Sequence, residues 1–248
     1  MGIALENSLL IDELKLSFNS SITTLSAIVD ARHPLTAGHS LRVTEYSLLI
    51  AKEMHLSEND IEVLRLAALL HDIGKIGIRD AILLKEGLFT PEERREMDSH
   101  PAKTRGILEK FYFPRSLQSV PEIACHHHEK VDGSGYPDGI TGDDLHLGSK
   151  IIAVADVFDA LTSRREYPKY NDQQTMGREP MPLMSVISLL QQEAGSHLDS
   201  EVVRVFLRCL PQALLLYRGE HFPPEYMDET LHRFAPGRLS GAAGLRLP

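Results

Sequence analysis

Cysteine and long apolar runs are scarce in this sequence of 248 residues, and each scarcity excludes a class of protein. The two cysteines, Cys125 and Cys209, are too few for a disulfide framework, so we expect reduced thiols in a cytosolic compartment. No apolar run approaches the ~18–20 residues of a membrane span. The N-terminus lacks the basic start and apolar core of a secretory signal, and Glu6 stands where N-myristoylation requires Ser or Thr. We therefore expect a soluble cytoplasmic protein that does not enter a membrane.

An excess of basic residues is also lacking. Lys and Arg number 26 against 35 Asp and Glu, which gives a net charge of −9. A broad basic face for a nucleic-acid polymer is therefore not expected. A small phosphate ester is still allowed, because bound metal ions reverse the sign of the local field. Histidine, in contrast, is abundant at 12 residues, and apolar residues make up 42% of the chain, which suffices for a full core.

Apolar residues recur at steps of three and four near the N-terminus and predict a helix over residues 8–30. The stripe consists of Leu14, Phe18, Ile22, Leu25 and Ile28. Two interpretations of this helix stay open. It either packs on the domain, or it forms an exposed stalk that pairs with a second chain into a homodimer.

The rest of the chain is also helical in pattern. Ser57 and Thr90 each stand three residues before an acidic residue and are expected to cap helices. Gly74 is expected to end the helix that leads into His71, and Pro101 is expected to hold His100 in an extended backbone between two helices. Other helices are expected over 39–55, 151–161 and 184–192, and residues 132–142 are rich enough in Gly and Pro to form a loop. No run alternates like a strand, so the predicted fold class is all-α with irregular loops.

Histidine and aspartate form two sets with the donor atoms of metal sites. The first set is His39, His71, Asp72 and Asp156. Asp156 lies in an apolar helix and needs a partner there, because burying a carboxylate unpaired costs on the order of several kcal/mol. An arginine would serve, but a shared metal accounts for more residues at once.

The second set is His100, His127 and His128. Adjacent histidines in isolation are often surface residues. Here they stand between an apolar segment and a Gly-rich loop, which is typical of a pocket rim. The neighbouring His126 makes a third consecutive imidazole, and not all three can face one point.

Taken in order, these residues resemble the HD-GYP branch of the HD superfamily of metal-dependent phosphohydrolases. The matching segments are Gly38-His39-Ser40 with Arg42-Val43, HDIGKIGI (71–78), Leu83-Leu84-Lys85, His100-Pro101, HHEKVDGSGYP (127–137) and VADVFDALTSRREY (154–167). The resemblance implies an HD-superfamily helical bundle with a dinuclear metal centre. It also implies hydrolysis of the bacterial second messenger cyclic di-GMP to linear pGpG or GMP. It divides the chain into an N-terminal helix or linker (1–24), the HD-GYP phosphodiesterase domain (25–210) and a C-terminal extension (211–248).

Carried over by position, the resemblance implies roles for single residues. One divalent ion would be held by His39, His71, Asp72 and Asp156, and Asp72 would bridge to a second ion held by His100, His127 and His128. Fe, Mn, Co, Ni and Zn all suit such ligands. Lys75 would contact the scissile phosphate and, with Asp72, carry the catalysis. The nucleotide is expected near Gly135, Tyr136, Pro137 and Arg165.

Two positions depart from the family's pattern. Leu35 stands where some members have a Glu that recruits a third metal, so we expect two ions. Pro168 stands where the family often has a lysine. The neighbouring Lys169 either takes over that phosphate contact or leaves it lost.

Three functions stay open at this point. The first is a cyclic dinucleotide phosphodiesterase that acts on cyclic di-GMP or on a hybrid GMP–AMP cyclic dinucleotide. The second is an HD hydrolase of ordinary nucleotides. The intact loop around Gly135-Tyr136-Pro137, the GYP loop, argues against it. The third is a catalytically weak module that senses the messenger and engages signalling proteins through the loop; the complete ligand set argues against it.

Overall fold

A computed structural model of the chain describes residues 2–32, 38–163, 169–170, 175–176, 180–217, 221–222 and 226, with side chains from residue 5 on except at 169–170 and 175–176. Its elements follow in the order α1 Gly2–Ala31, α2 His39–Glu53, α3 Glu58–Leu70, η2 Ile73–Gly77, α4 Asp80–Leu83, α5 Pro91–Met97, α6 His100–Leu108, η3 Arg115–Leu117, α7 Val120–Cys125, η4 His126–His128, α8 Leu147–Thr162, β1 Lys169–Tyr170, β2 Thr175–Met176, α9 Leu183–Glu193 and α10 Ser200–Leu216. The predicted all-α fold class is confirmed. β1 and β2 are two residues each and pair antiparallel, Lys169 with Met176.

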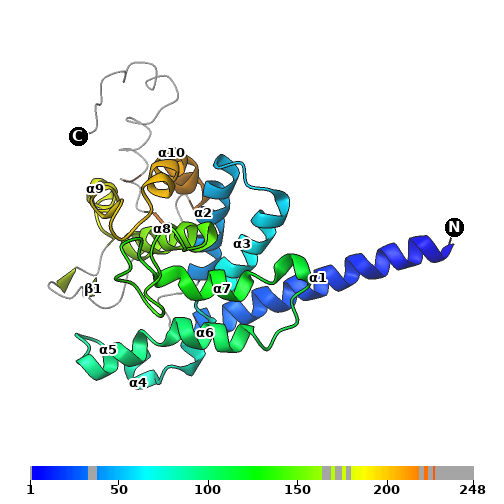
Figure 1. Cartoon of the computed structure of the whole chain (residues 1–248), viewed down its shortest axis with the longest axis horizontal. Coiled ribbons are helices and arrows are strands. Elements are labelled where there is room, and N and C mark those ends of the chain that lie inside the picture. The colour runs from blue at the N-terminus through cyan, green and yellow to red at the C-terminus, as the bar shows by residue number, and fades with distance from the viewer. Residues whose placement is uncertain are drawn as a thin grey trace, which may run out of the picture.

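Helix α8 lies in the middle of the domain and packs against α2, α7, α9 and α10 (Figure 1). Most of its residues are apolar, and 11 of its 16 residues are buried. Phe158 at its centre meets Tyr46 of α2 edge-on at a centroid distance of 5.2 Å and Phe206 of α10 at 4.8 Å. Such aromatic pairs add roughly 0.5–1.5 kcal/mol each beyond their burial. The helix that carries Asp156 is therefore fixed on several sides.

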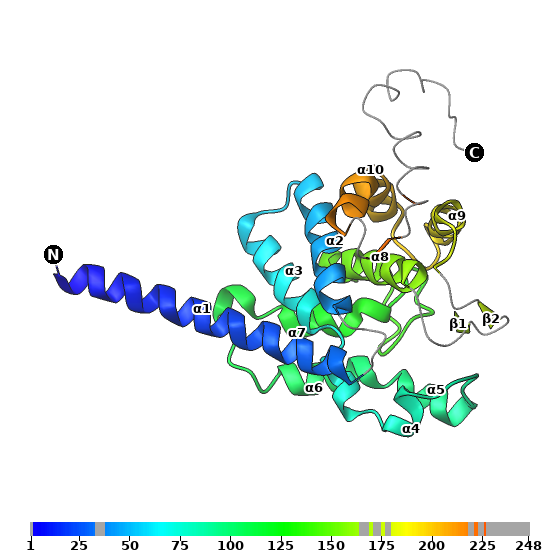
Figure 2. The ribbon, with the colours of Figure 1, turned by 180° about the vertical axis from the view of Figure 1, so that it is seen from behind.

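Helix α1 packs on the domain at its C-terminal end, and its N-terminal half projects away from it (Figures 1 and 2). Ile22 and Val29 are buried against the core, whereas Leu14 and Leu16 are 69% and 70% exposed. The predicted stripe is therefore not the buried face along its whole length. The packed interpretation holds for one half of the helix, and the exposed one describes the other.

Two predicted helix caps are confirmed. The side chain of Ser57 accepts a hydrogen bond from the Asp60 N–H at the start of α3. Thr90 and Glu93 form a complete capping box at the start of α5.

The predicted role of Gly74 is wrong. Helix α3 already ends at Leu70, and Gly74 lies inside the 3-10 helix η2. A Cβ on Gly74 would lie 2.0 Å from the His100 carbonyl oxygen and 2.5 Å from the Thr104 nitrogen. Glycine is needed because the backbone of α6 passes directly over it.

The predicted backbone of His100 is also wrong, although its place in the chain is right. It lies between α5 and α6 as expected, but it is the first residue of α6 and not an extended residue before it. Pro101 then occupies the first turn of the helix, where its missing N–H costs nothing.

The C-terminal part of the described chain belongs to the same core. Helix α10 continues through Pro211, and Leu210, Ala213 and Leu214 are buried on its inner face. The boundary expected after residue 210 therefore falls inside a core helix. Among the described residues, none of the helices has the length and apolar character needed to cross a lipid bilayer.

Candidate metal centre

All seven ligands predicted from the sequence come together at one place in the fold. They arrive from separate elements: His39 begins α2, His71 and Asp72 follow α3, His100 begins α6, His127 and His128 form η4, and Asp156 lies in α8. Three groups have donor atoms within 4.8 Å of one another: His39, His71 and Asp156; His71, Asp72 and His127; and His100, His127 and His128. Except for the half-buried His128 and Asp156, these residues are buried.

The carboxylate of Asp72 lies between two sets of imidazoles. Its Oδ2 is 3.6 Å from Nε2 of His39 and 3.4 Å from Nε2 of His71. Its Oδ1 is 3.3 Å from Nε2 of His100 and 3.9 Å from Nε2 of His127. Each oxygen thus faces one set, which is the arrangement that a carboxylate bridging two cations requires.

Backbone carbonyls fix the tautomer of three of the imidazoles. In each, Nδ1 lies within hydrogen-bond distance of the carbonyl oxygen three residues earlier: His71 with Ala68 at 2.6 Å, His100 with Met97 at 2.8 Å, and His127 with Ala124 at 2.7 Å. A carbonyl oxygen only accepts, so Nδ1 carries the hydrogen. The lone pair of the neutral ring is then on Nε2, which faces Asp72.

Two buried polar atoms at this centre have no hydrogen-bond partner among the described residues. They are Nε2 of His71 and Oδ1 of Asp72. A buried polar atom without a partner costs roughly 1–3 kcal/mol. Both atoms belong to residue types that ligate metals, and both face the middle of the cluster. The donor set therefore fits metal ions.

His39 differs from the other ligands because its Nδ1 bonds to a carboxylate. Asp159 accepts from Nδ1 at 2.8 Å. It also accepts from Nε of Arg42 at 2.7 Å and from the hydroxyl of Ser163 at 3.2 Å, and it lies 3.7 Å from Nε2 of His221. Sequence reasoning missed this role. Asp159 follows Asp156 by three residues on one face of an apolar helix, and that spacing was the available signal. An arginine was one possible partner for Asp156, but Arg42 bonds to Asp159 instead.

Burial keeps two of the imidazoles neutral. It lowers the pKa of His127 well below its ordinary value and that of His128 to about 3. Burial would raise the pKa of Asp72, but the Lys75 ammonium and the nearby imidazoles outweigh it and hold that pKa well below its ordinary value. Neutral imidazoles and ionised carboxylates are the forms that bind metal ions.

Lys75 lies in η2, and its ammonium donates to Oδ2 of Asp72. The Lys75 side chain is 25% exposed. A positive charge thus stands beside the Asp72 carboxylate and remains reachable from solvent.

The GYP loop approaches the centre at His128. A Cβ on Gly135 would lie 2.4 Å from the Lys130 nitrogen, so only glycine allows the loop to fold this closely over η4. The ring of Tyr136 then lies 5.0 Å from that of His128. Burial raises the pKa of the Tyr136 hydroxyl, which therefore stays protonated as a hydrogen-bond donor. Pro137 follows it, half-buried.

The far side of this loop is tied down by residues whose roles sequence reasoning also missed. Glu129 accepts hydrogen bonds from the backbone N–H groups of residues 138, 139 and 140. His126 lies 2.9 Å from the carboxylate of Asp138, which also pairs with Arg105. His126, Glu129 and Asp138 are close enough to hold a metal, but their atoms are already engaged in these bonds. His126 points to this cluster and not to Asp72.

Three sequence predictions fall where the structure describes little. Arg165, Leu35 and Pro168 lie outside the described residues. Lys169 is the first residue of β1, and its side chain lies outside the described part. The structure therefore leaves their predicted roles untested.

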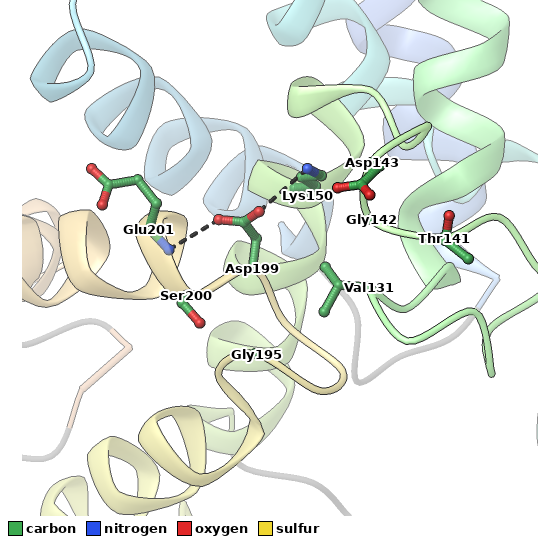
Figure 3. Close-up of a pocket in the computed structure, with 9 residues that line it drawn as sticks. All are labelled: Val131, Thr141, Gly142, Asp143, Lys150, Gly195, Asp199, Ser200 and Glu201. Atoms are coloured by element: carbon green, nitrogen blue, oxygen red, sulfur yellow. Dashed lines mark hydrogen bonds and ion pairs between the residues drawn. The ribbon is translucent and has the colours of Figure 1, made fainter. Parts of the chain in front are cut away.

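A separate cleft of about 440 Å³ lies between the base of the GYP loop and the start of α10 (Figure 3). Lys150 pairs with Asp199 across it at 3.3 Å, and its wall also carries Asp143 and Glu201. With three carboxylates against one ammonium, this cleft would repel a phosphodiester. The His/Asp cluster is the better place for one.

Comparison with known proteins places this geometry in a family. A sequence model described as HD domain matches residues 23–202. The chain is 39% identical over 210 residues to the 3'3'-cGAMP-specific phosphodiesterase 3 of Vibrio cholerae, a match that covers 84% of this chain and 42% of that protein. It is 38% identical over 223 residues to a cyclic di-GMP phosphodiesterase of Thermotoga maritima, with 90% and 57% covered. The chain thus spans about half the length of the curated relatives it matches.

A solved structure shares the fold. It is Bd1817, an HDG"Y"P protein of Bdellovibrio bacteriovorus, with a TM-score of 0.53 and 19% identity over 69% of this chain and 51% of that one. The same family is indicated by the helical arrangement, by the His-Asp pair after α3 and by the HD domain match over residues 23–202. The chain belongs to the HD domain family, within its HD-GYP branch.

Proposed function

We propose that this protein is a metal-dependent phosphodiesterase that hydrolyses a cyclic dinucleotide, with cyclic di-GMP as the substrate. The observation that carries the proposal is the position of Asp72, whose two oxygens face two separate sets of imidazole nitrogens 3.3–3.9 Å away. The names of the relatives support the substrate class, because they act on cyclic di-GMP or on 3'3'-cGAMP.

Two divalent transition-metal ions would occupy this centre. One would be held by His39, His71 and Asp156, the other by His100, His127 and His128, and both by Asp72. Nitrogen and oxygen donors of this kind suit Fe, Mn, Co, Ni or Zn. When bound, two such cations supply positive charge for the phosphoryl oxygens and lower the pKa of water at the site.

The chain's own residues would orient the diester and manage its charge. Hydrolysis adds water across one P–O bond, so the departing alkoxide needs a proton and the phosphoryl oxygens need compensating charge. Lys75 presents its ammonium beside Asp72, where it would meet a phosphoryl oxygen or protonate the leaving oxygen. Tyr136, protonated and facing His128, would bind the nucleotide from the GYP loop. Gly135 and Pro137 would shape that loop, and Arg165 and Lys169 would hold the outer phosphate.

A hybrid GMP–AMP cyclic dinucleotide is the second candidate substrate. The relative at 39% identity is named for 3'3'-cGAMP and the one at 38% for cyclic di-GMP, so identity alone favours neither base. We favour cyclic di-GMP because HD-GYP proteins as a family degrade it.

Parallel hydrolysis assays test the proposal and choose between the substrates. Cyclic di-GMP and 3'3'-cGAMP are incubated separately with Mn²⁺-loaded protein, and the linear dinucleotides and mononucleotides are separated by ion-exchange chromatography. We expect cyclic di-GMP to be turned over faster. Asp143→Asn, in the separate cleft, serves as the matched control that keeps activity. Faster turnover of 3'3'-cGAMP would reverse the substrate assignment, and turnover of neither would refute the function.

We also propose that the GYP loop is the surface that signalling partners contact.

We further propose that the projecting half of α1 pairs with a second copy of the chain. Leu5, Leu9, Leu10, Ile11, Leu14 and Leu16 are exposed along α1. Apolar side chains in such number on one exposed helix favour association. Analytical ultracentrifugation of the wild type and of a Leu14→Glu/Leu16→Glu variant tests it, with a dimer expected only for the wild type.

A further inference from the structure

The last turn of α1 caps the helix that carries His39. Helix α2 begins at His39 after Gly38, which has no side chain to cap it. The carboxylate of Asp30 takes this place: it accepts from the Ser40 backbone N–H at 3.2 Å and from the Ser40 hydroxyl at 2.8 Å. Both residues are buried. An anion at a helix N-terminus also interacts favourably with the helix dipole, so Asp30 fixes the point at which His39 enters the centre.

Arg32, the residue directly after α1, holds the segment that carries Lys75. Arg32 donates to the carbonyl oxygen of Lys75 at 2.8 Å and to that of Ile78 at 3.0 Å. It also pairs with Asp80 at 2.5 Å. Lys75 lies in η2 and Ile78 directly follows it, and the Lys75 oxygen also accepts a hydrogen bond from the Ile78 N–H at 3.1 Å. Arg32 thereby fixes the backbone from which the Lys75 ammonium reaches Asp72.

Two residues separated by one position thus hold both sides of the centre. Asp30 holds the His39 side, Arg32 holds the Lys75 side, and Asp72 lies between His39 and Lys75. The rest of α1 extends well beyond the domain (Figures 1 and 2). A displacement of this arm would therefore act on His39 and on Lys75 at once.

We propose that Asp30 and Arg32 are positioning residues that couple α1 to the metal centre, Asp30 through His39 and Arg32 through Lys75. This inference rests on the proposed function only for its rate measurements. A purely structural attachment of α1 would have no preference for these two segments. The chain offers a contact of that plain kind for comparison: Arg65 of α3 donates to Asn19 of α1 at 2.7 Å, away from the centre.

The test compares Asp30→Ala and Arg32→Met with Asn19→Ala as the matched control. Mn²⁺ affinity is measured by isothermal titration calorimetry, and kcat and KM are measured with cyclic di-GMP. We expect Asp30→Ala to weaken one Mn²⁺ site by about tenfold or more, as for other residues that orient a metal ligand. Arg32→Met should leave Mn²⁺ binding intact and lower kcat by about tenfold with KM unchanged, because Lys75 acts in the transition state. Asn19→Ala should change neither quantity.

Ser40→Ala replaces Asp30→Ala if the latter fails to fold, since it removes only one of the two bonds, and a smaller loss of Mn²⁺ affinity in the same site is then expected. Unchanged Mn²⁺ affinity in the Asp30 or Ser40 variant would overturn the proposal. Equal losses in the Asn19 control would do the same. If the wild type binds Mn²⁺ but hydrolyses no cyclic dinucleotide, the proposed function fails while the calorimetric comparison still decides the coupling of Asp30 to His39.

Discussion

The Nδ1 atom of His39 and the Oδ2 atom of Asp159 lie 2.8 Å apart, which joins a candidate metal ligand to a buried carboxylate. Asp159 is itself held by Arg42 through Nε at 2.7 Å and Nη2 at 3.0 Å. A carboxylate behind an imidazole sets the tautomer of the ring and raises its basicity as a ligand. Among the other candidate ligands, Nδ1 of His71, His100 and His127 bonds to a backbone carbonyl, so the ring of His39 is the most strongly polarised of these four.

Replacing Asp159 should therefore weaken metal binding at the His39 side. We expect Asp159→Asn to lower the Mn²⁺ affinity of one site by about 10–100-fold, the usual effect of losing a partner of a metal-bound histidine. The melting temperature should also fall, because the buried Arg42 guanidinium loses its ion pair with Asp159. Calorimetric titration with Mn²⁺ checks the affinity, and Asp143→Asn is the control. An unchanged affinity together with a lowered melting temperature would make Asp159 purely structural.

Asp72→Ala should remove both metals and all activity, because it deletes the carboxylate that faces both sets of imidazoles. Metal content by elemental analysis after gel filtration is the measurement. His126→Ala should keep the metals, since His126 points to Asp138. It should instead raise KM by loosening the GYP loop. Loss of metal from the His126 variant would show that the register through the three consecutive histidines is wrong.

Lys75→Ala should slow the chemical step while metals stay bound. Losing one preorganised charge at a developing anion costs about 10²–10³-fold in kcat, and single-turnover kinetics measures it. Lys169→Ala should mainly raise KM, because an outer phosphate contact serves ground and transition states alike. Loss of turnover in the Lys169 variant together with unchanged turnover in the Lys75 variant would contradict the assignment of Lys75 as the catalytic cation.

Tyr136→Ala should impair substrate handling and leave the fold intact. The ring is half-buried and packs against His128 at the edge of the centre, not in the core. We expect a higher KM, full metal content and a melting temperature close to that of the wild type. A large drop in melting temperature by differential scanning calorimetry would instead make Tyr136 a structural residue.

Much of the fold and the candidate ligand set was predictable because the signals are local or paired with specific chemistry. Ser57 and Thr90 cap helices through bonds to residues three positions away, which a sequence pattern reveals. The candidate ligands are histidines and aspartates, and their order along the chain matches the motifs of the HD-GYP family. The relation of Asp72 to His100 depends on helices packing together, yet the motif order implied it.

The errors concern contacts between distant segments. Gly74 reads as a helix stop, but its role is to let the backbone of His100 pass, and only the packed fold reveals that neighbour. The roles of Asp159 and Asp30 were not predicted, because their partners lie elsewhere in the sequence. Asp159 bonds to His39, 120 residues away, and Asp30 bonds to Ser40, 10 residues away. Local rules carry no information on these contacts.

The central claim is that the His/Asp cluster is a metal centre that cleaves a cyclic dinucleotide. Removal and return of metal in one preparation test it most directly. The protein is stripped with a chelator, dialysed, and assayed for cyclic di-GMP and 3'3'-cGAMP hydrolysis while Mn²⁺ is added back stepwise. We predict no hydrolysis after stripping and recovery that is complete at about two bound ions per chain, as a two-metal site requires. Full activity in the stripped protein, or no hydrolysis at any metal content, would contradict the account.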